Sequence, residues 1–129
     1  MPDQLTCICI DDDPLLLRKL ETYIEDIPWL TFLEAFNKPI KGASAIVSEK
    51  PDLVFLDIEM PMVDGNYVAD WIGPKLELME KPPKIIIVSS LTIARENQLP
   101  QVTGYINKAN VTSPEALERM VKEILGLTD

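Results

Sequence analysis

The sequence predicts a doubly wound α/β fold, in which five parallel strands form one sheet and helices cover both of its faces. Short apolar segments alternate with stretches of helical periodicity along the 129 residues. This alternation favours a parallel sheet, because a helix normally connects one strand to the next parallel strand. The segments LVFL and IIIV are continuously apolar, as expected for strands that are buried on both faces. We expect a single domain over residues 1–129.

The first predicted strand, Leu5–Ile10, leads directly into an amphipathic helix. Asp13 is a suitable N-cap and Pro14 fits the first helical position. Pro28 ends this helix, and the second strand follows at Leu30–Phe36. The apolar residues of the helix recur at spacings of four, four and three, at Leu16, Leu20, Ile24 and Ile27.

The middle of the chain predicts two more helices around the third strand. One begins near Pro39 and runs through IKGASAIVSEK, although Gly42 weakens its helical pattern. The third strand is predicted at Leu53–Leu56. The helix after it is expected to kink or break at Pro74, because proline clashes with the preceding turn. Its apolar stripe comprises Val68, Ile72, Leu76 and Met79.

The remaining elements are a fourth strand at Ile85–Val88, a fifth at Tyr105–Ile106 and the helices that follow them. Between these strands, only Ile93–Leu99 is suited to a short fourth helix before the next proline. The last helix has the clearest signals, because Thr112 or Ser113 can cap it. Its apolar stripe comprises Leu117, Val121, Ile124 and Leu125.

Composition excludes several classes of partner. The net charge is -9, with 12 Lys+Arg against 21 Asp+Glu, which argues against nucleic-acid binding because that requires clustered cations. No apolar run approaches the ~20 residues that span a bilayer, and the start MPDQLTC lacks a signal-peptide pattern. We therefore expect no membrane insertion and a cytoplasmic location. Cys7 and Cys9, the only cysteines, are interpreted as small buried hydrophobes.

Reactive side chains fall at the ends of four predicted strands. The triplet 11–13 is all aspartate, Asp57 closes the third strand, Ser89 and Ser90 close the fourth, and Lys108 follows the fifth. Each residue alone fits a helix cap, a turn or a solvated loop. Together they predict a site, because ligands of open parallel sheets bind at the carboxyl ends of the strands.

The acids of this edge predict a cation. Two carboxylates ~4 Å apart repel by roughly 4 kcal/mol at an effective dielectric constant near 20, so the cluster should share a proton or bind a cation. Mg2+ suits it, because Mg2+ takes carboxylate oxygens together with waters and phosphate oxygens. An aspartate beside Mg2+, a hydroxyl and a lysine form a phosphoryl-transfer site, with the aspartate as nucleophile.

The chain resembles the response-regulator receiver domain of two-component signalling. That family has an acidic pair after its first strand, the phosphorylated Asp after its third, Ser or Thr after its fourth, an aromatic within its fifth and Lys just beyond. The segment LDIEMPMVDG also matches the family's D-x-x-M-P-x-x-x-G loop. The resemblance implies a flavodoxin-like fold and a phosphoacceptor signalling domain rather than an enzyme. The matching residues are Asp11, Asp12, Asp57, Ser89, Tyr105 and Lys108.

The resemblance also implies a set of Mg2+ ligands and a phosphoryl donor. Asp57 would accept the phosphoryl group from a sensor histidine kinase or a phosphotransfer protein. Mg2+ would bind directly to Asp12, Asp57 and the backbone carbonyl of Glu59, and to Asp11 through water. The third aspartate of the triplet, Asp13, is left as the cap of the first helix.

The resemblance gives the remaining matched residues roles in the response to phosphorylation. Ser89 would hydrogen-bond the phosphoryl group, Lys108 would pair with it, and Tyr105 would be the rotating aromatic. The resemblance places an output surface, and a homodimer interface, on the fourth helix, fifth strand and last helix. Ala109 stands where the family usually has proline after a cis peptide. Because a non-proline cis bond costs ~3 kcal/mol, the sequence leaves open whether this peptide is cis or trans. The stretch YIEDIPWLTFLEAFNKP resembles receivers that are joined to a LytTR-type DNA-binding domain.

Two other functions fit parts of the pattern. A haloacid-dehalogenase-type phosphatase would use Asp11 as nucleophile with Asp13, Ser89 and Lys108, but it requires an acidic pair after the lysine and leaves Asp57 unexplained. A flavodoxin-like binder of flavin phosphate would require a loop rich in Ser, Thr and Gly after the first strand, where this chain has three acids.

Overall fold

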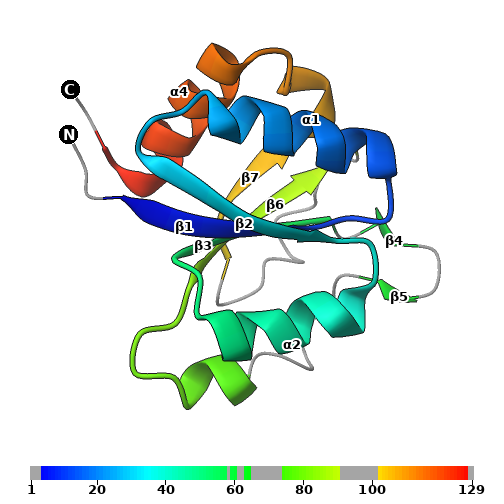
Figure 1. Cartoon of the computed structure of the whole chain (residues 1–129), viewed down its shortest axis with the longest axis vertical. Helices are drawn as coiled ribbons and strands as arrows, with labels where there is room; N and C mark the ends of the chain where they lie inside the picture. The colour runs from blue at the N-terminus through cyan, green and yellow to red at the C-terminus, as the bar shows by residue number, and fades with distance from the viewer. Residues whose placement is uncertain (1–3, 58, 61–62, 65–73, 91–101, 128–129) are drawn as a thin grey trace.

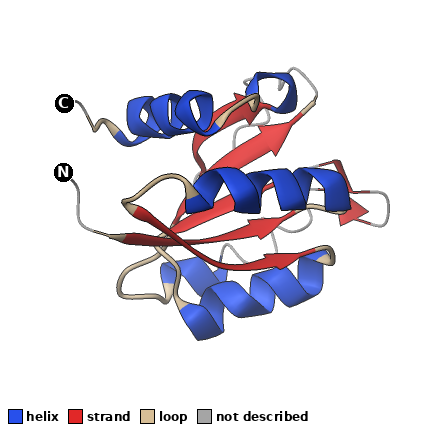
Figure 2. Cartoon of the chain, turned by 45° about the horizontal axis from the view of Figure 1, so that its top comes forward, coloured by secondary structure: helices blue, strands red, loops and turns tan. Residues whose placement is uncertain are grey.

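The computed structural model describes residues 4–57, 59–60, 63–64, 74–90 and 102–127. Five strands form one parallel sheet in the order β2-β1-β3-β6-β7, which confirms the predicted doubly wound fold. Helices α1 and α4 cover one face of this sheet and α2 covers the other (Figure 1; Figure 2). The strands are β1 (Leu5–Ile10), β2 (Leu30–Phe36), β3 (Leu53–Leu56), β6 (Lys84–Ser89) and β7 (Val102–Asn107). The helices are α1 (Pro14–Glu25), α2 (Pro39–Glu49), the short 3-10 helix η2 (Lys108–Asn110) and α4 (Pro114–Leu125).

The first three strands match the predicted ranges to the residue, whereas β6 and β7 are longer than predicted. In β7, Gly104 carries little strand propensity, yet the whole strand pairs with β6, from Ile85 with Val102 to Ser89 with Asn107. Tertiary pairing therefore extends β7 beyond its apolar residues.

The region around the third predicted helix differs in detail from the expectation. Residues 74–77 are helical, but Leu78 and Met79 are not, so this helix ends earlier than predicted. The part of the predicted helix before residue 74 lies outside the described residues, as does the predicted fourth helix, Ile93–Leu99. A two-stranded antiparallel pair, β4 (Glu59–Met60) with β5 (Val63–Asp64), was not predicted. Two residues per strand are too few to produce a readable alternation.

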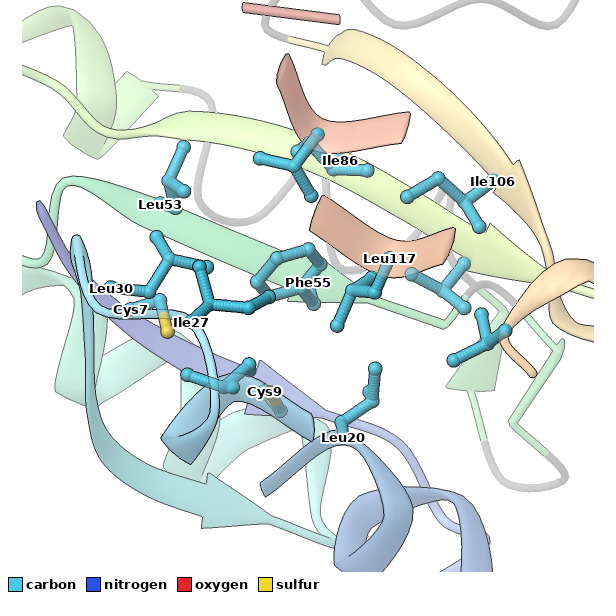
Figure 3. Packing of buried hydrophobic residues seen from close by; sticks show 14 of the residues in the cluster. Cys7, Cys9, Leu20, Ile27, Leu30, Leu53, Phe55, Ile86, Ile106 and Leu117 are labelled. Carbon is cyan, nitrogen blue, oxygen red and sulfur yellow. The ribbon is translucent and has the colours of Figure 1, made fainter. Parts of the chain in front are cut away.

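The core is divided by the sheet into two layers. Alternate residues of β1 face opposite sides, so Cys7 and Cys9 pack under α1 and α4, whereas Ile8 and Ile10 pack under α2. Phe55 of β3 joins the first layer (Figure 3). Both sides are buried, which explains why the strands are continuously apolar.

The two cysteines behave as small hydrophobes, as predicted. Both are free thiols with no exposed surface. Burial raises the pKa of Cys7 to about 12 and raises the pKa of Cys9 well above its ordinary value. Both thiols therefore stay protonated and are poor metal ligands.

Two glycines permit the helices to approach the sheet closely. A Cβ added at Gly42 in α2 would lie 2.6 Å from the side chain of Ile10, and one added at Gly104 in β7 would lie 2.5 Å from Ile124 of α4. Gly42 weakens the helical pattern of the sequence, but the packing of α2 on β1 requires it. Within the described part of the chain, no helix has the length and apolar character needed to cross a membrane.

Candidate functional site

The strand order brings the first two acidic segments together. Strands β1 and β3 are neighbours, and Asp11 and Asp57 are the residues that directly follow them. The backbone N–H of Asp57 donates to the carbonyl of Ile10 (2.9 Å), and that of Asp11 donates to the carbonyl of Phe36 (3.0 Å). The sheet hydrogen bonding thus continues to both aspartates and fixes their backbones at the carboxyl edge.

Three carboxylates converge at this edge. One oxygen each from Asp11, Asp12 and Asp57 lies within 4.8 Å of the others. The side chains of Asp11 and Asp57 are 3% and 1% exposed, and Asp12 is half-buried. Asp11 Oδ1 accepts the backbone N–H of Asp13 (2.8 Å), which holds this carboxylate in a local turn.

The third aspartate of the triplet has a separate task. Asp13 is exposed, and its Oδ1 accepts the N–H groups of Leu15 (3.0 Å) and Leu16 (3.4 Å), so it is the N-cap of α1 as predicted. The phosphatase alternative requires Asp13 as the partner of Asp11. The capping hydrogen bonds and the exposure of Asp13 argue against that role.

Lys108 supplies the positive charge of the site. Its Nζ lies 3.0 Å from Asp11 Oδ2 and 3.4 Å from Asp57 Oδ2. Burial lowers the pKa of the Lys108 ammonium, but the hydrogen bonds and charges of the two aspartates outweigh this and the net shift is upward. The lysine therefore stays charged between the two acids.

The pKa of Asp11 is raised from 3.8 to about 6. Burial is the largest cause, and the charge of Asp57 adds to it, while the N–H of Asp13 and the ammonium of Lys108 act in the opposite direction. Burial and the second carboxylate make the ionised form of Asp11 costly, and a bound cation would stabilise that form. The raised pKa is therefore expected of a cation-binding site.

The loop that carries Lys108 contains no cis peptide bond, so the peptide before Ala109, whose state the sequence left open, is trans. The chain turns into η2 at Lys108, and Asn107 Oδ1 accepts the N–H of Ala109 (2.8 Å). Lys108 reaches both acids although the family's proline is absent.

The hydroxyl positions lie at the end of β6, which is next to β3, and in β7, which is next to β6. Ser89 ends β6, is 1% exposed and is paired in register with Asn107 of β7. Ser90 is exposed. Tyr105 lies in β7 and packs against the core layer on the α2 side. Among the described residues, its buried hydroxyl has no hydrogen-bond partner.

The acids fit a divalent metal in charge and in kind. Three carboxylates and one ammonium sum to -2, because -3 and +1 are added. Mg2+ ligand oxygens at ~2.1 Å from the ion are at most ~4.2 Å apart, slightly less than the 4.8 Å limit that bounds this cluster. Small side-chain rotations, or a water between Asp11 and the ion, close the difference. Glu59, the predicted carbonyl ligand, begins β4 two residues after Asp57.

Comparisons with known proteins agree with this geometry. Residues 7–122 match the family model described as response regulator receiver domain. The chain is 30% identical over 93 residues to protein-glutamate methylesterase/protein-glutamine glutaminase 1 of Pseudomonas savastanoi pv. phaseolicola, which covers 71% of this chain and 25% of that protein. It is 33% identical over 93 residues to the protein-glutamate methylesterase/protein-glutamine glutaminase of the group 3 operon of Bradyrhizobium diazoefficiens, and this match covers 71% of this chain and 24% of that protein. The chain spans about a quarter of the length of these relatives.

Solved structures share the fold. The signal receiver domain of the putative response regulator NarL from Mycobacterium tuberculosis superposes with a TM-score of 0.77 at 19% identity, covering 97% of this chain and 99% of that one. The response regulator domain of Thermotoga maritima CheB gives 0.72 at 20% identity, covering 98% of both chains. None of the relatives named here is described as a LytTR-type regulator, so they give that expected origin no support.

Proposed function

Because the chain belongs to the response regulator receiver domain family, we propose that Asp57 is the residue that accepts its phosphoryl group. The chain is a phosphoacceptor signalling module, and receiver domains are phosphorylated by histidine kinases. The observation that carries the assignment is the convergence of three carboxylates and the ammonium of Lys108 at one edge of the sheet. A sensor histidine kinase or a phosphotransfer protein is the proposed donor, and residues 1–129 are proposed to act as one domain.

In the proposed reaction, a carboxylate oxygen of Asp57 attacks the phosphorus atom of the donor. An oxygen–phosphorus bond forms while the bond between phosphorus and the donor's histidine nitrogen breaks, which yields an aspartyl phosphate. Lys108 Nζ lies 3.4 Å from Asp57 Oδ2, so its positive charge can pair with the transferred group. The buried hydroxyl of Ser89 is proposed to donate a hydrogen bond to a phosphoryl oxygen.

We propose Mg2+ as the cofactor. Its protein ligands would be Asp12, Asp57 and the backbone carbonyl of Glu59, with Asp11 bound through water. When bound, the ion supplies positive charge to the phosphoryl oxygens. The site net charge of -2 supports a divalent rather than a monovalent cation.

The output is proposed to pass through β7 and α4. Phosphorylation adds roughly two negative charges, which would draw Ser89 toward the phosphoryl group and let Tyr105 rotate. The Tyr105 hydroxyl is buried and has no hydrogen-bond partner among the described residues, which supports this role because such a group favours an alternative position. A homodimer through the region of the fourth helix, β7 and α4 is part of the proposal, as is a cytoplasmic location.

Phosphorylation by acetyl phosphate with Mg2+ tests the assignment. Asp57→Asn is expected to abolish covalent phosphate incorporation, measured by intact-protein mass. Asp13→Asn is the matched control, because it removes the same charge two residues from Asp11 while asparagine keeps the helix cap. Labelling of Asp57→Asn at the level of the parent protein would disprove the assignment. Loss of labelling in Asp13→Asn would show that removing any negative charge near the site abolishes phosphorylation, so that the result with Asp57→Asn would not identify the phosphoacceptor.

A further inference from the structure

Lys108 must extend across the edge of the sheet to pair with a phosphoryl group on Asp57. It follows β7, and β6 separates β7 from β3 in the strand order. Its Nζ nevertheless lies 3.0 Å from Asp11 and 3.4 Å from Asp57, which follow β1 and β3. The direction of the Lys108 backbone as it leaves β7 therefore decides whether the ammonium arrives at the acids.

A side chain of the neighbouring residue fixes that direction. Asn107 is extended, with φ -80° and ψ 131°, and remains paired with Ser89 in the sheet. Its Oδ1 accepts the N–H of Ala109 at 2.8 Å, so a hydrogen-bonded ring closes around Lys108 itself. The chain consequently changes from strand to the 3-10 turn of η2 at Lys108.

The far end of the turn is anchored separately. The N–H of Val111 donates to the carbonyl of Lys108 at 3.1 Å, and the side chain of Val111 is completely buried. The backbone of Lys108 is thus fixed on one side by Asn107 and on the other by Val111. The bond from Asn107 depends on a free N–H at position 109, which alanine provides and proline would lack.

We propose that Asn107 is a positioning residue for Lys108, which directs the ammonium toward Asp11 and Asp57 through its hydrogen bond to the N–H of Ala109. This inference rests on the function proposed for Asp57 and Lys108. Asn107 is exposed, and in this proposal it aligns the loop that carries Lys108. The sequence motif of the site includes no residue with this role.

The first test compares rates of phosphorylation by acetyl phosphate at fixed Mg2+. Asn107→Ala is expected to slow the rate about two- to tenfold, the equivalent of one ordinary hydrogen bond. Asn107→Asp keeps the acceptor oxygen and is expected to restore most of the rate. Mg2+ affinity, measured by calorimetry, should not fall, because the proposed metal ligands follow β1 and β3. A rate unchanged by Asn107→Ala, or changed only in parallel with Mg2+ affinity, would overturn the proposal.

Two double-mutant cycles test the route. Ala109→Pro removes the donor, so Asn107→Ala should have no further effect in the Ala109→Pro background. Lys108→Ala removes the group that is positioned, so Asn107→Ala should have no further effect there either. An undiminished effect of Asn107→Ala in either background would overturn the proposal.

The same assay separates this inference from the proposed function. If Asp57→Asn is not labelled while Asn107→Ala reacts at the parental rate, the phosphoacceptor assignment stands and the positioning role fails. If Asp57→Asn is labelled normally, the function itself fails. An unfolding midpoint lowered by Asn107→Ala with an unchanged rate counts against positioning, because it identifies a bond that serves stability alone.

Discussion

Replacing Lys108 with methionine removes the cation that stands between two buried carboxylates. In the parent protein, the ammonium lies 3.0 Å from Asp11 Oδ2 and 3.4 Å from Asp57 Oδ2. At an effective dielectric constant near 20, these attractions are each roughly 5 kcal/mol before any desolvation cost is subtracted. Removing one partner of a buried ion pair costs about 3–5 kcal/mol. Because the lysine side chain is 19% exposed, we expect a loss of about 2–4 kcal/mol in the free energy of unfolding without Mg2+ near pH 8.

The loss should depend on pH. The pKa of Asp11 is raised to about 6 in the folded protein from 3.8, so the folded state binds a proton more tightly than the unfolded state does. This contribution to stability is fully present below about pH 4 and is lost as the pH rises through about 6. Without Lys108, the pKa of Asp11 should rise further. The destabilisation by Lys108→Met is therefore expected to shrink on acidification to about pH 5, and Mg2+ near pH 8 should stabilise this variant more than the parent protein.

Urea unfolding followed by tryptophan fluorescence measures these differences, because Trp29 is buried in the core layer under α1 and α4. Lys122→Met is the matched control: the Lys122 side chain is 20% exposed, and its Nζ lies 3.9 Å from Glu118 Oε2. Since this pair is partly exposed, lies within one helix and is 3.9 Å apart, we expect a loss of at most about 1 kcal/mol. Equal stability of the Lys108→Met and parent proteins near pH 8 without Mg2+ would refute the electrostatic account of the site.

Three further substitutions test packing and polar contacts of β7, α4 and the core. Gly104→Ala places a Cβ within 2.5 Å of Ile124, so thermal unfolding should show a loss of about 1–3 kcal/mol; an unchanged midpoint would contradict the close packing of α4 on β7. Tyr105→Phe removes a buried hydroxyl without a partner among the described residues, so urea unfolding should show no loss, and a loss above about 1 kcal/mol would reveal a bond that the hydroxyl makes. Glu118→Leu leaves the buried indole N–H of Trp29 without its acceptor at 2.7 Å, so a loss of about 1–3 kcal/mol is expected in urea, whereas Glu118→Gln should retain most of the stability.

The predictable parts of the fold are those with strong local signals. Strands buried on both faces, such as Leu53–Leu56, are read from continuous apolar runs. The start of α1 is read from Asp13 and Pro14, because the cap and the first helical position have specific chemistry. These signals are local, so they do not require knowledge of neighbouring elements.

The parts that sequence reasoning missed depend on contacts between distant segments. The first half of β7 is strand because it pairs with β6, and the antiparallel pair β4–β5 has only two residues on each side. Gly42 lowers helix propensity, yet the helix is retained because Ile10 fills the space that a Cβ would occupy. The candidate site residues were predicted because reactive side chains follow several strands, and because their order along the chain is a family pattern. The exposed Asn107 was not, because neither charge nor hydropathy distinguishes it from an ordinary loop residue.

The charges of the site explain why three consecutive aspartates are tolerated after a buried strand. Asp13 faces solvent and satisfies the first turn of α1, so its charge lies at the positive end of a helix. Asp11 and Asp12 remain for the site, and Asp57 adds a third negative charge from the neighbouring strand. Lys108 neutralises one of the three, and the proposed Mg2+ would neutralise the other two. The proposed phosphorylation of Asp57 would add roughly two negative charges, and Lys108, which is 3.4 Å from Asp57 Oδ2, would then pair with the phosphoryl group. Because Lys108 directly follows β7, this ammonium is the group through which the proposed chemistry at Asp57 would act on β7 and α4.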